Sequence, residues 1–159
     1  MENLFCAKAT REDIPFLNEV YHENIAALHG IPRTPGYWEA LLADPGRTCY
    51  VVHRERPVAW FRIDMEEGRF WLGMLQVKPL YQRQGIGRYV LSVAEAMARE
   101  KGYSKIGIHA TQDNLAARAL YSSAGYAVTQ IGPCTTGDGV ERVGYTFEKS
   151  LTKPDRGQQ

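Results

Sequence analysis

The stretch Gln82-Arg83-Gln84-Gly85-Ile86-Gly87-Arg88 decides the fold, because it joins a strand-like apolar segment, 69–77, to a helix predicted over 86–101. That helix is indicated by apolar residues spaced three or four apart, namely Ile86, Val90, Val93 and Met97. The first N–H groups of a helix have no internal partner and carry partial positive charge. Glycine at 85 and 87 lets a ligand approach the backbone, and two arginines add positive charge. The stretch therefore predicts a pyrophosphate-binding loop.

Other interpretations of this loop remain open. Two glycines can also form a plain turn beside solvated arginines. A dinucleotide site would need a third small residue at position 90, where Val90 stands. A P-loop would need a Gly-Lys-Ser/Thr sequence, which this chain lacks. A protein that binds a different nucleotide phosphate stays a weaker alternative.

The flanking sequence predicts an α/β fold. Strands are expected over 3–8, 48–53, 58–64, 69–77, 104–110, 126–131 and 142–149. Helices are expected over 11–29, 37–43, 86–101 and 114–124. Because a helix separates 69–77 from 104–110, these two strands are expected to be parallel within a mixed, mostly antiparallel sheet. We expect a single domain over 1–150 and a polar tail over 151–159.

Composition excludes several classes of protein. The chain has 159 residues, 44% of them hydrophobic and 23% charged, which is typical of one globular domain. The net charge of +1 gives no reason to expect a nucleic-acid or membrane partner. The chain has three cysteines without a C-x-x-C motif and four histidines without metal-ligand spacing, so we expect no metal site. Reduced cysteines and the lack of a secretion signal favour a cytoplasmic protein.

A second motif lies downstream, and the two together carry a resemblance. It reads Asn114-x-x-Ala117-x-x-Leu120-Tyr121-x-x-x-Gly125-Tyr126. With Gln82-x-x-Gly85-x-Gly87, it resembles the GNAT N-acetyltransferase superfamily, whose members carry Gln/Arg-x-x-Gly-x-Gly/Ala and then Asn-x-x-Ala-x-x-Leu-Tyr-x-x-x-Gly-Phe. The motifs cover 75–126, and the order of elements agrees over 4–149. The resemblance implies acetyl-CoA as co-substrate, an amine-bearing acceptor (small molecule or peptide), and flanking helices around a splayed parallel strand pair.

The same resemblance implies where the cofactor binds. Strands 69–77 and 104–110 would part at their ends, so that the pantetheine arm pairs with backbone there and the pyrophosphate rests on N–H groups of the loop. The residues expected to bind acetyl-CoA are Gln76, Val77, Gln82, Arg83, Gln84, Gly85, Ile86, Gly87, Arg88, Asn114 and Tyr121. Asn114 also suits a helix N-cap, and both roles can hold together.

Catalytic roles follow from the chemistry of acetyl transfer to an amine. Tyr121 matches the family tyrosine that protonates the departing thiolate, and the alternative is a core aromatic on the inner face of helix 114–124. Trp71 stands where histone-type members carry a glutamate. The base is expected to be His109, at the position where other members have a glutamate, acting directly or through water. The alternative is that His109 only forms hydrogen bonds. The backbone N–H of Val77 is the candidate oxyanion donor.

The acceptor cannot be identified from sequence patterns. Candidates are a peptide N-terminus, a lysine, a polyamine, an aminoglycoside and a small metabolite amine. Residues considered as acceptor contacts are Glu23, Tyr37, Trp38, Asp138 and Glu141. No cysteine lies in a motif, so direct transfer in a ternary complex is expected. A non-catalytic acyl-CoA sensor of the same fold is the alternative function, and a homodimer is a candidate assembly.

Overall fold

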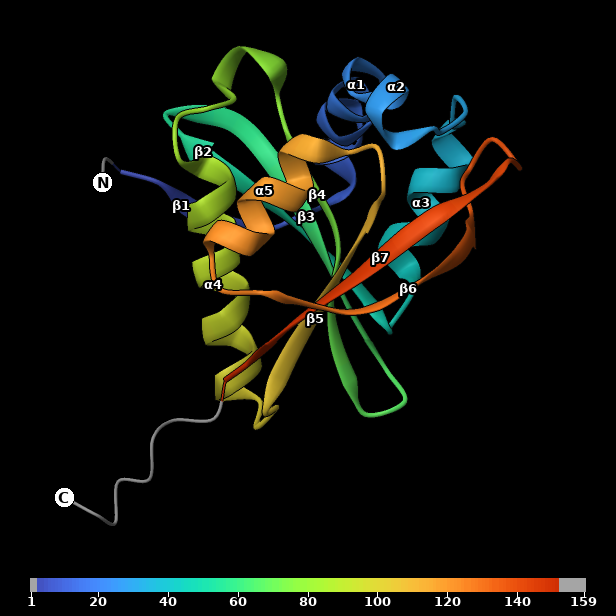
Figure 1. The fold of residues 1–159 in the computed structure, drawn as a ribbon. Helices are drawn as coiled ribbons and strands as arrows, with labels where there is room; N and C mark the ends of the chain where they lie inside the picture. Colours follow the sequence, from blue (N-terminus) through green and yellow to red (C-terminus); the bar gives the residue numbers. More distant parts are fainter. Residues whose placement is uncertain (1–2, 152–159) are drawn as a thin grey trace, which may run out of the picture.

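A computed structural model describes residues 3–151, which form one seven-stranded sheet in the order β1-β2-β3-β4-β5-β7-β6 (Figure 1). The strands are β1 Phe5–Lys8, β2 Arg47–Arg54, β3 Arg56–Glu66, β4 Arg69–Val77, β5 Lys105–Thr111, β6 Ala127–Thr135 and β7 Glu141–Ser150. The helices are η1 Arg11–Asp13, α1 Ile14–Glu23, α2 Ile25–Leu28, α3 Pro35–Ala43, η2 Pro79–Tyr81, α4 Ile86–Glu100 and α5 Leu115–Ser123. Neighbouring strands are antiparallel except β4 and β5, which confirms the predicted fold class.

The sheet separates two hydrophobic clusters. Helices α4 and α5 cover one face, where α4 buries Ile86, Val90, Leu91, Ala94 and Ala98. Helices α1 and α3 cover the other face, where Leu17, Val20 and Trp38 pack around Trp60 of β3. The apolar periodicity of each helix therefore points toward the sheet, as in other layered α/β folds.

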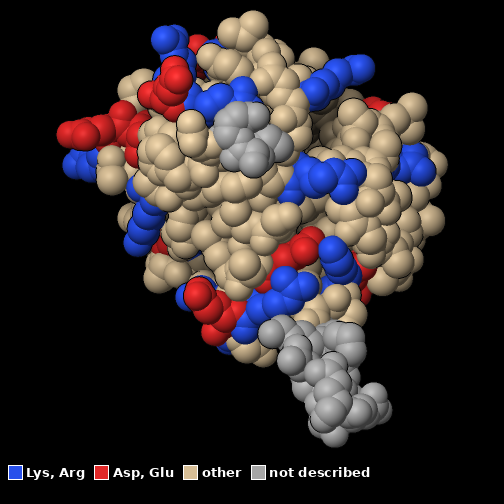
Figure 2. Space-filling view, turned by 90° about the vertical axis from the view of Figure 1, so that its left-hand side faces the viewer, with Lys and Arg blue, Asp and Glu red and all other residues tan. Residues whose placement is uncertain are grey.

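Charges of both signs are interspersed on the side of the molecule that faces left in Figure 1. Figure 2 shows that face with basic and acidic side chains next to one another. No helix within residues 3–151 is long and apolar enough to cross a bilayer.

The first helix differs from the prediction, which had one continuous helix over 11–29. Instead, 11–13 is a 3-10 turn, α1 ends at Glu23 and α2 begins at Ile25. Asn24 lies at the break, where its side-chain amide donates to Gln76 Oε1 (3.1 Å) and Val77 O (3.0 Å). Tertiary hydrogen bonds thus interrupt a segment whose local pattern is helical throughout.

The C-terminal strands are longer than the sequence predicts. β6 continues to Thr135 and pairs with β7 up to that residue, with a register shift between Val128 and Gln130, whereas the sequence suggested an end at 131. Leu151, expected in the polar tail, is buried, and its N–H donates to Ser104 O (2.7 Å). The rest of that tail lies outside the described residues.

The parallel strands β4 and β5 part after a short contact. Their only pairs are Trp71 with Gly107 and Leu72 with Ile108, while β5 stays paired with β7 as far as Thr111. At this point β4 carries a bulge, because Arg62 of β3 pairs with Met74 and Ile63 pairs with Leu72, so that Gly73 is left over. The predicted splay is confirmed, and it leaves backbone groups of β4 directed into a gap.

Candidate active site

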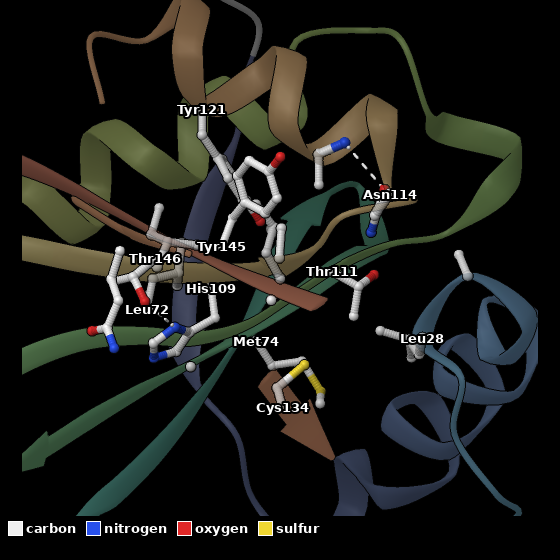
Figure 3. Close-up of a pocket in the computed structure, with 18 of the residues that line it drawn as sticks. Leu28, Leu72, Met74, His109, Thr111, Asn114, Tyr121, Cys134, Tyr145 and Thr146 are labelled. Carbon is white, nitrogen blue, oxygen red and sulfur yellow. Dashed lines mark hydrogen bonds between the residues drawn. The ribbon is translucent and has the colours of Figure 1, made fainter. Parts of the chain in front are cut away.

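Two cavities meet in the gap between β4 and β5. The first, of about 510 Å³, lies against the loop before α4 and is called the loop-side cavity. The second, of about 530 Å³, lies against β4, β5, β6 and β7 and is called the strand-side cavity (Figure 3). Residues that line both cavities are Ala27, Leu28, Leu75, Gln76, Asn114, Ala117 and Tyr121. A ligand entering from one side can therefore reach a ligand bound on the other.

The loop-side cavity is bordered by a backbone suited to an anion. Arg83 (φ 65°) and Gly85 (φ 87°) are both left-handed, and Gly85 is the N-cap of α4. Tyr89 N donates to Gly85 O (3.0 Å), so the N–H groups between these residues have no carbonyl inside the helix. Alternation of left- and right-handed residues beside a helix N-terminus makes a concave nest of N–H groups that binds phosphate.

Most of the loop residues predicted from the sequence line this cavity. Those that do so are Gln82, Arg83, Gly85, Ile86, Gly87 and Arg88. Gln84 is not among the lining residues, and its side-chain oxygen accepts from Arg54 Nη1 (2.7 Å). A Cβ on Gly87 would stand 2.9 Å from Leu120 Cδ2, so glycine allows α5 to approach α4 closely.

A hydrogen-bonded network fixes the end of β4. Val77 O accepts from Asn24 Nδ2 (3.0 Å) and from Gln82 Nε2 (3.0 Å). Lys78 N donates to Val58 O (3.0 Å), on the β3 side. Because successive residues of a strand direct their N–H groups to opposite sides, the Val77 N–H points into the gap. Sequence reasoning missed Asn24, since an asparagine inside a helical pattern carries no signal of a tertiary contact.

Asn114 is the N-cap of α5, as its sequence context predicts. Its side-chain oxygen accepts from Ala117 N (3.2 Å), which leaves the amide NH₂ available to a ligand. Asn114 lines both cavities. A structural role and a binding role are therefore compatible at this residue.

Tyr121 projects from α5 to the junction of the two cavities. It is 7% exposed and packs edge-on against Phe147 (5.4 Å between ring centroids). Burial raises the pKa of the phenol to about 12, so the hydroxyl keeps its proton at neutral pH. Tyr121 is thus a core aromatic and a cavity residue at once.

His109 is the first residue of β5 after its last pair with β4, and it lines the strand-side cavity only. Its Nδ1 lies 3.2 Å from Thr146 Oγ1, and its ring stacks on Trp71 (4.6 Å between centroids). Loss of hydration lowers the pKa of His109, and the charge of Arg69 lowers it further, while Glu148 opposes the shift. The imidazole is therefore neutral at pH 7 and able to accept a proton.

The side chains considered as acceptor contacts lie elsewhere. Glu23 binds Lys78 Nζ (2.9 Å), and Trp38 is 1% exposed in the core. Tyr37 packs against Arg33, and Asp138 binds Arg142 (2.9 Å). None of these lines either cavity, and neither does Glu141.

Residues from the last two strands take their place in the strand-side cavity. Those that the sequence did not single out as acceptor contacts include Gln130, Gly144, Tyr145 and Thr146. Only the pairing of β7 with β5 brings this hairpin beside the gap. The alternating pattern of the two strands predicts their existence but not their neighbour.

A family comparison agrees with this geometry. The model of the "Acetyltransferase (GNAT) family" matches residues 14–126, which is more than half of the chain. The chain belongs to the GNAT acetyltransferase family. The match includes the loop before α4 and the whole of α5.

Solved structures share this GNAT fold over nearly the whole chain. The ribosomal-protein-S18-alanine N-acetyltransferase from Escherichia coli superposes with a TM-score of 0.74 and 19% identity, covering 97% of each chain. An acetyltransferase structure from Salmonella typhimurium, described with its cofactor acetyl-CoA, gives a TM-score of 0.75 and 19% identity, covering 98% of this chain and 99% of the other. At this level of identity the likeness is one of fold.

A curated relative matches part of the GNAT domain. The mycothiol acetyltransferase of Jonesia denitrificans is 31% identical over 68 residues, which are 43% of this chain and 22% of that protein. The chain thus matches about a fifth of that relative's length. Within residues 3–151, no group of three His, Cys, Asp or Glu side chains is arranged to hold a metal ion.

Proposed function

We propose that the protein is an N-acetyltransferase that moves an acetyl group from acetyl-CoA directly to a primary amine in a ternary complex. The observation that carries the proposal is the junction of two cavities at the unpaired part of β4, with Tyr121 lining both. Direct transfer requires both substrates to meet at one point, and this junction provides it.

The loop-side cavity suits coenzyme A in its shape and in its polar groups. The pyrophosphate would rest on N–H groups between Arg83 and Arg88, at the start of α4. The pantetheine arm would lie along β4 at Gln76 and Val77, where β5 is absent as a partner. The free amide NH₂ of Asn114 would donate to a pantetheine carbonyl.

The chemical step follows from these positions. A neutral amine attacks the thioester carbon, and the Val77 N–H donates to the oxyanion of the tetrahedral intermediate. When the C–S bond breaks, Tyr121 supplies a proton to the coenzyme A sulfur. His109 removes a proton from the acceptor amine, directly or through water, before or during attack. The acetyl group ends on nitrogen, and the thiol of coenzyme A leaves.

A non-catalytic acyl-CoA-binding module is the second candidate function. The observation that favours it is the wall of the strand-side cavity, where no carboxylate of the described residues is available as a general base. Where histone-type members carry a glutamate, β4 has Trp71, whose ring stacks on His109. Turnover distinguishes the two functions, because a sensor would bind acetyl-CoA tightly and release no thiol.

The test combines binding and turnover. Calorimetry with coenzyme A should show saturable binding, with ATP and NAD as controls that do not bind. Thiol release from acetyl-CoA should then depend on an added amine from a panel of peptides, polyamines and small amines. Binding without release from any amine would favour the sensor, and stabilisation by ATP or NAD alone would contradict both functions.

Other properties of the protein stay predictions. We expect a single domain over 1–150 in a cytoplasmic protein, without a nucleic-acid or membrane partner. A homodimer would pair the last strands or the N-terminal helices, and analytical ultracentrifugation with and without coenzyme A would test it.

A further inference from the structure

The strand-side cavity has a neutral wall. Among residues 3–151, no Asp, Glu, Lys or Arg lines it. Much of the wall is apolar, with Leu28, Leu72, Met74, Ile108 and Pro133 contributing carbon and sulfur atoms. An ammonium group held here without a carboxylate would lose hydration and gain no ionic partner.

Charged groups next to this wall are already bound to other residues. Asp113 accepts from Thr111 Oγ1 (2.8 Å) and contacts His29 Nε2 (2.8 Å). Arg118 stacks on the ring of Tyr145 and donates to Gln112 O (2.6 Å). Asp113 is thus directed toward Thr111 and His29, Arg118 toward Gln112 and Tyr145, and neither charged side chain lines the cavity.

A second pair of charged side chains, Arg69 and Glu148, lies near Trp71 and forms an ion pair. Arg69 binds Glu148 Oε2 (2.7 Å) and lies over the Trp71 ring, which in turn stacks on His109. Neither Arg69 nor Glu148 lines the strand-side cavity.

Three neutral side chains that can form hydrogen bonds, His109, Thr146 and Gln130, line the same cavity in one row across β5, β7 and β6. His109 pairs with Thr146 across β5 and β7, and Thr146 pairs with Gln130 across β7 and β6. Figure 3 shows His109 and Thr146 next to each other, with Met74 and Cys134 nearby. This row can bind a hydroxyl, a carbonyl or an amide of a ligand without any ionic contact.

We propose that the acceptor is a primary amine with an apolar body and no second charged group, whose remaining polar groups are neutral. This inference rests on the proposed function and narrows its substrate class. A cavity of about 530 Å³ is large enough for a substituted aromatic amine. Polyamines and aminoglycosides are disfavoured because each would bring further ammonium groups to a wall without carboxylates.

A matched series of benzylamines tests the inference on the wild-type protein. The para substituent is hydrogen, hydroxymethyl, carboxylate or aminomethyl, so the skeleton is kept while the charge changes. We expect kcat/KM for the two compounds with an uncharged substituent to exceed that for either compound with a charged substituent by at least about tenfold. Equal or better use of the carboxylate or the aminomethyl compound would overturn the inference and leave the proposed function intact.

Binding separates failure of the inference from failure of the proposed function. Calorimetry of the same series is carried out on the protein saturated with coenzyme A. If no amine is acetylated but the compounds with an uncharged substituent bind more tightly, the enzyme assignment fails while the preference of the cavity for uncharged groups stands. If no member binds, or if the carboxylate or the aminomethyl compound binds best, the inference is overturned.

A variant pair gives an independent readout. Met74 lines the strand-side cavity and not the loop-side cavity. Met74→Glu adds a carboxylate to the wall, and Met74→Gln is its neutral control of similar size. We expect Met74→Glu to shift preference toward the aminomethyl compound at least about tenfold relative to Met74→Gln. An unchanged preference in a folded Met74→Glu protein would contradict the inference.

Discussion

At the scale of single residues, two side chains carry the proposed proton transfers, and their environments differ. Tyr121 is buried in the core beside Phe147, while His109 is exposed and stacked on Trp71. Burial raises one pKa and partial loss of hydration lowers the other. The tyrosine therefore holds its proton, and the histidine is ready to accept one, at the same neutral pH.

Tyr121→Phe should reduce kcat and leave coenzyme A binding in place. The substitution removes the hydroxyl that would protonate the thiolate but keeps the ring packed in the core. We expect a fall in kcat of about 10²-fold, in the range typical of a general acid. Calorimetry with coenzyme A is the control, and an unchanged kcat would assign Tyr121 to the core alone.

His109→Gln should alter the pH dependence of kcat/KM. In the wild type the base must be neutral, so activity is lost as pH falls through the histidine pKa, which lies below its ordinary value of 6.5. The variant should lose this acid limb and fall by about 10²-fold at neutral pH. Thr146→Val, which removes the hydroxyl next to His109 Nδ1, is the control for the hydrogen bond alone. An unchanged acid limb in His109→Gln would show that another group is the base.

At the scale of elements, the loop before α4 and the gap beside β4 depend on backbone geometry. Gly85 has φ 87°, where an L side chain is strained, and Gly73 occupies a bulge against the Arg62–Asp64 ion pair. A Cβ on Gly73 would stand 2.2 Å from Asp64 Oδ2. Glycine at 85 allows the left-handed turn before α4, and glycine at 73 allows the bulge of β4 beside Asp64.

Gly85→Ala should weaken coenzyme A binding beyond its effect on stability. The left-handed conformation costs an L residue about 1–2 kcal/mol, and relaxation of that strain would move the N–H groups that face the pyrophosphate. Gly102→Ala is a matched control, because Gly102 (φ 86°) follows α4 and lies far along the chain from the loop. Both variants should lower Tm, and only Gly85→Ala should raise the Kd for coenzyme A.

At the scale of the whole molecule, one sheet carries both hydrophobic clusters, and β3 and β4 contribute to each. Phe61 and Leu72 belong to one cluster, while Trp60 and Met74 belong to the other. Two cores that share strands should unfold together.

We therefore expect one cooperative unfolding transition. Urea unfolding followed by tryptophan fluorescence and by far-ultraviolet circular dichroism should give coincident midpoints. Trp38 and Trp60 report on the α1–α3 face, while the dichroism reports on all helices. Separate midpoints would contradict a single domain over 1–150.

Alkaline pH should destabilise the molecule through tyrosines whose pKa values are raised by full or partial burial. The pKa values of Tyr121 and Tyr89 are raised from 10 to about 12, and that of Tyr126 is raised by burial and by its hydrogen bond to Glu95. The unfolded chain releases these protons above its own pKa while the folded chain retains them. Stability is therefore fully present below pH 10 and is lost as the pH rises toward the folded-state values.

The check is the urea midpoint at about pH 9 and about pH 11. The wild type should lose more stability between these values than Tyr121→Phe, which has one fewer buried phenol. Equal losses would show that Tyr121 ionises as easily in the folded protein as in the unfolded chain.

The sequence by itself determined most of the elements and the shape of the loop before α4, because these depend on neighbours a few residues apart. Helical spacing predicted α4, and the separation of 69–77 from 104–110 by a helix predicted their parallel pairing. Local glycines and arginines predicted the nest at the start of α4. The Asn114 cap likewise follows from residues three apart.

The tertiary structure alone decided which strands surround the gap and which side chains line the strand-side cavity. The break at Asn24 depends on contacts with Gln76 and Val77, over fifty residues away. The wall of Cys134, Gly144 and Thr146 depends on β7 pairing with β5. Periodicity specifies which side of a strand is apolar, but long-range pairing selects the neighbouring strand, and that choice sets the chemistry of the strand-side cavity.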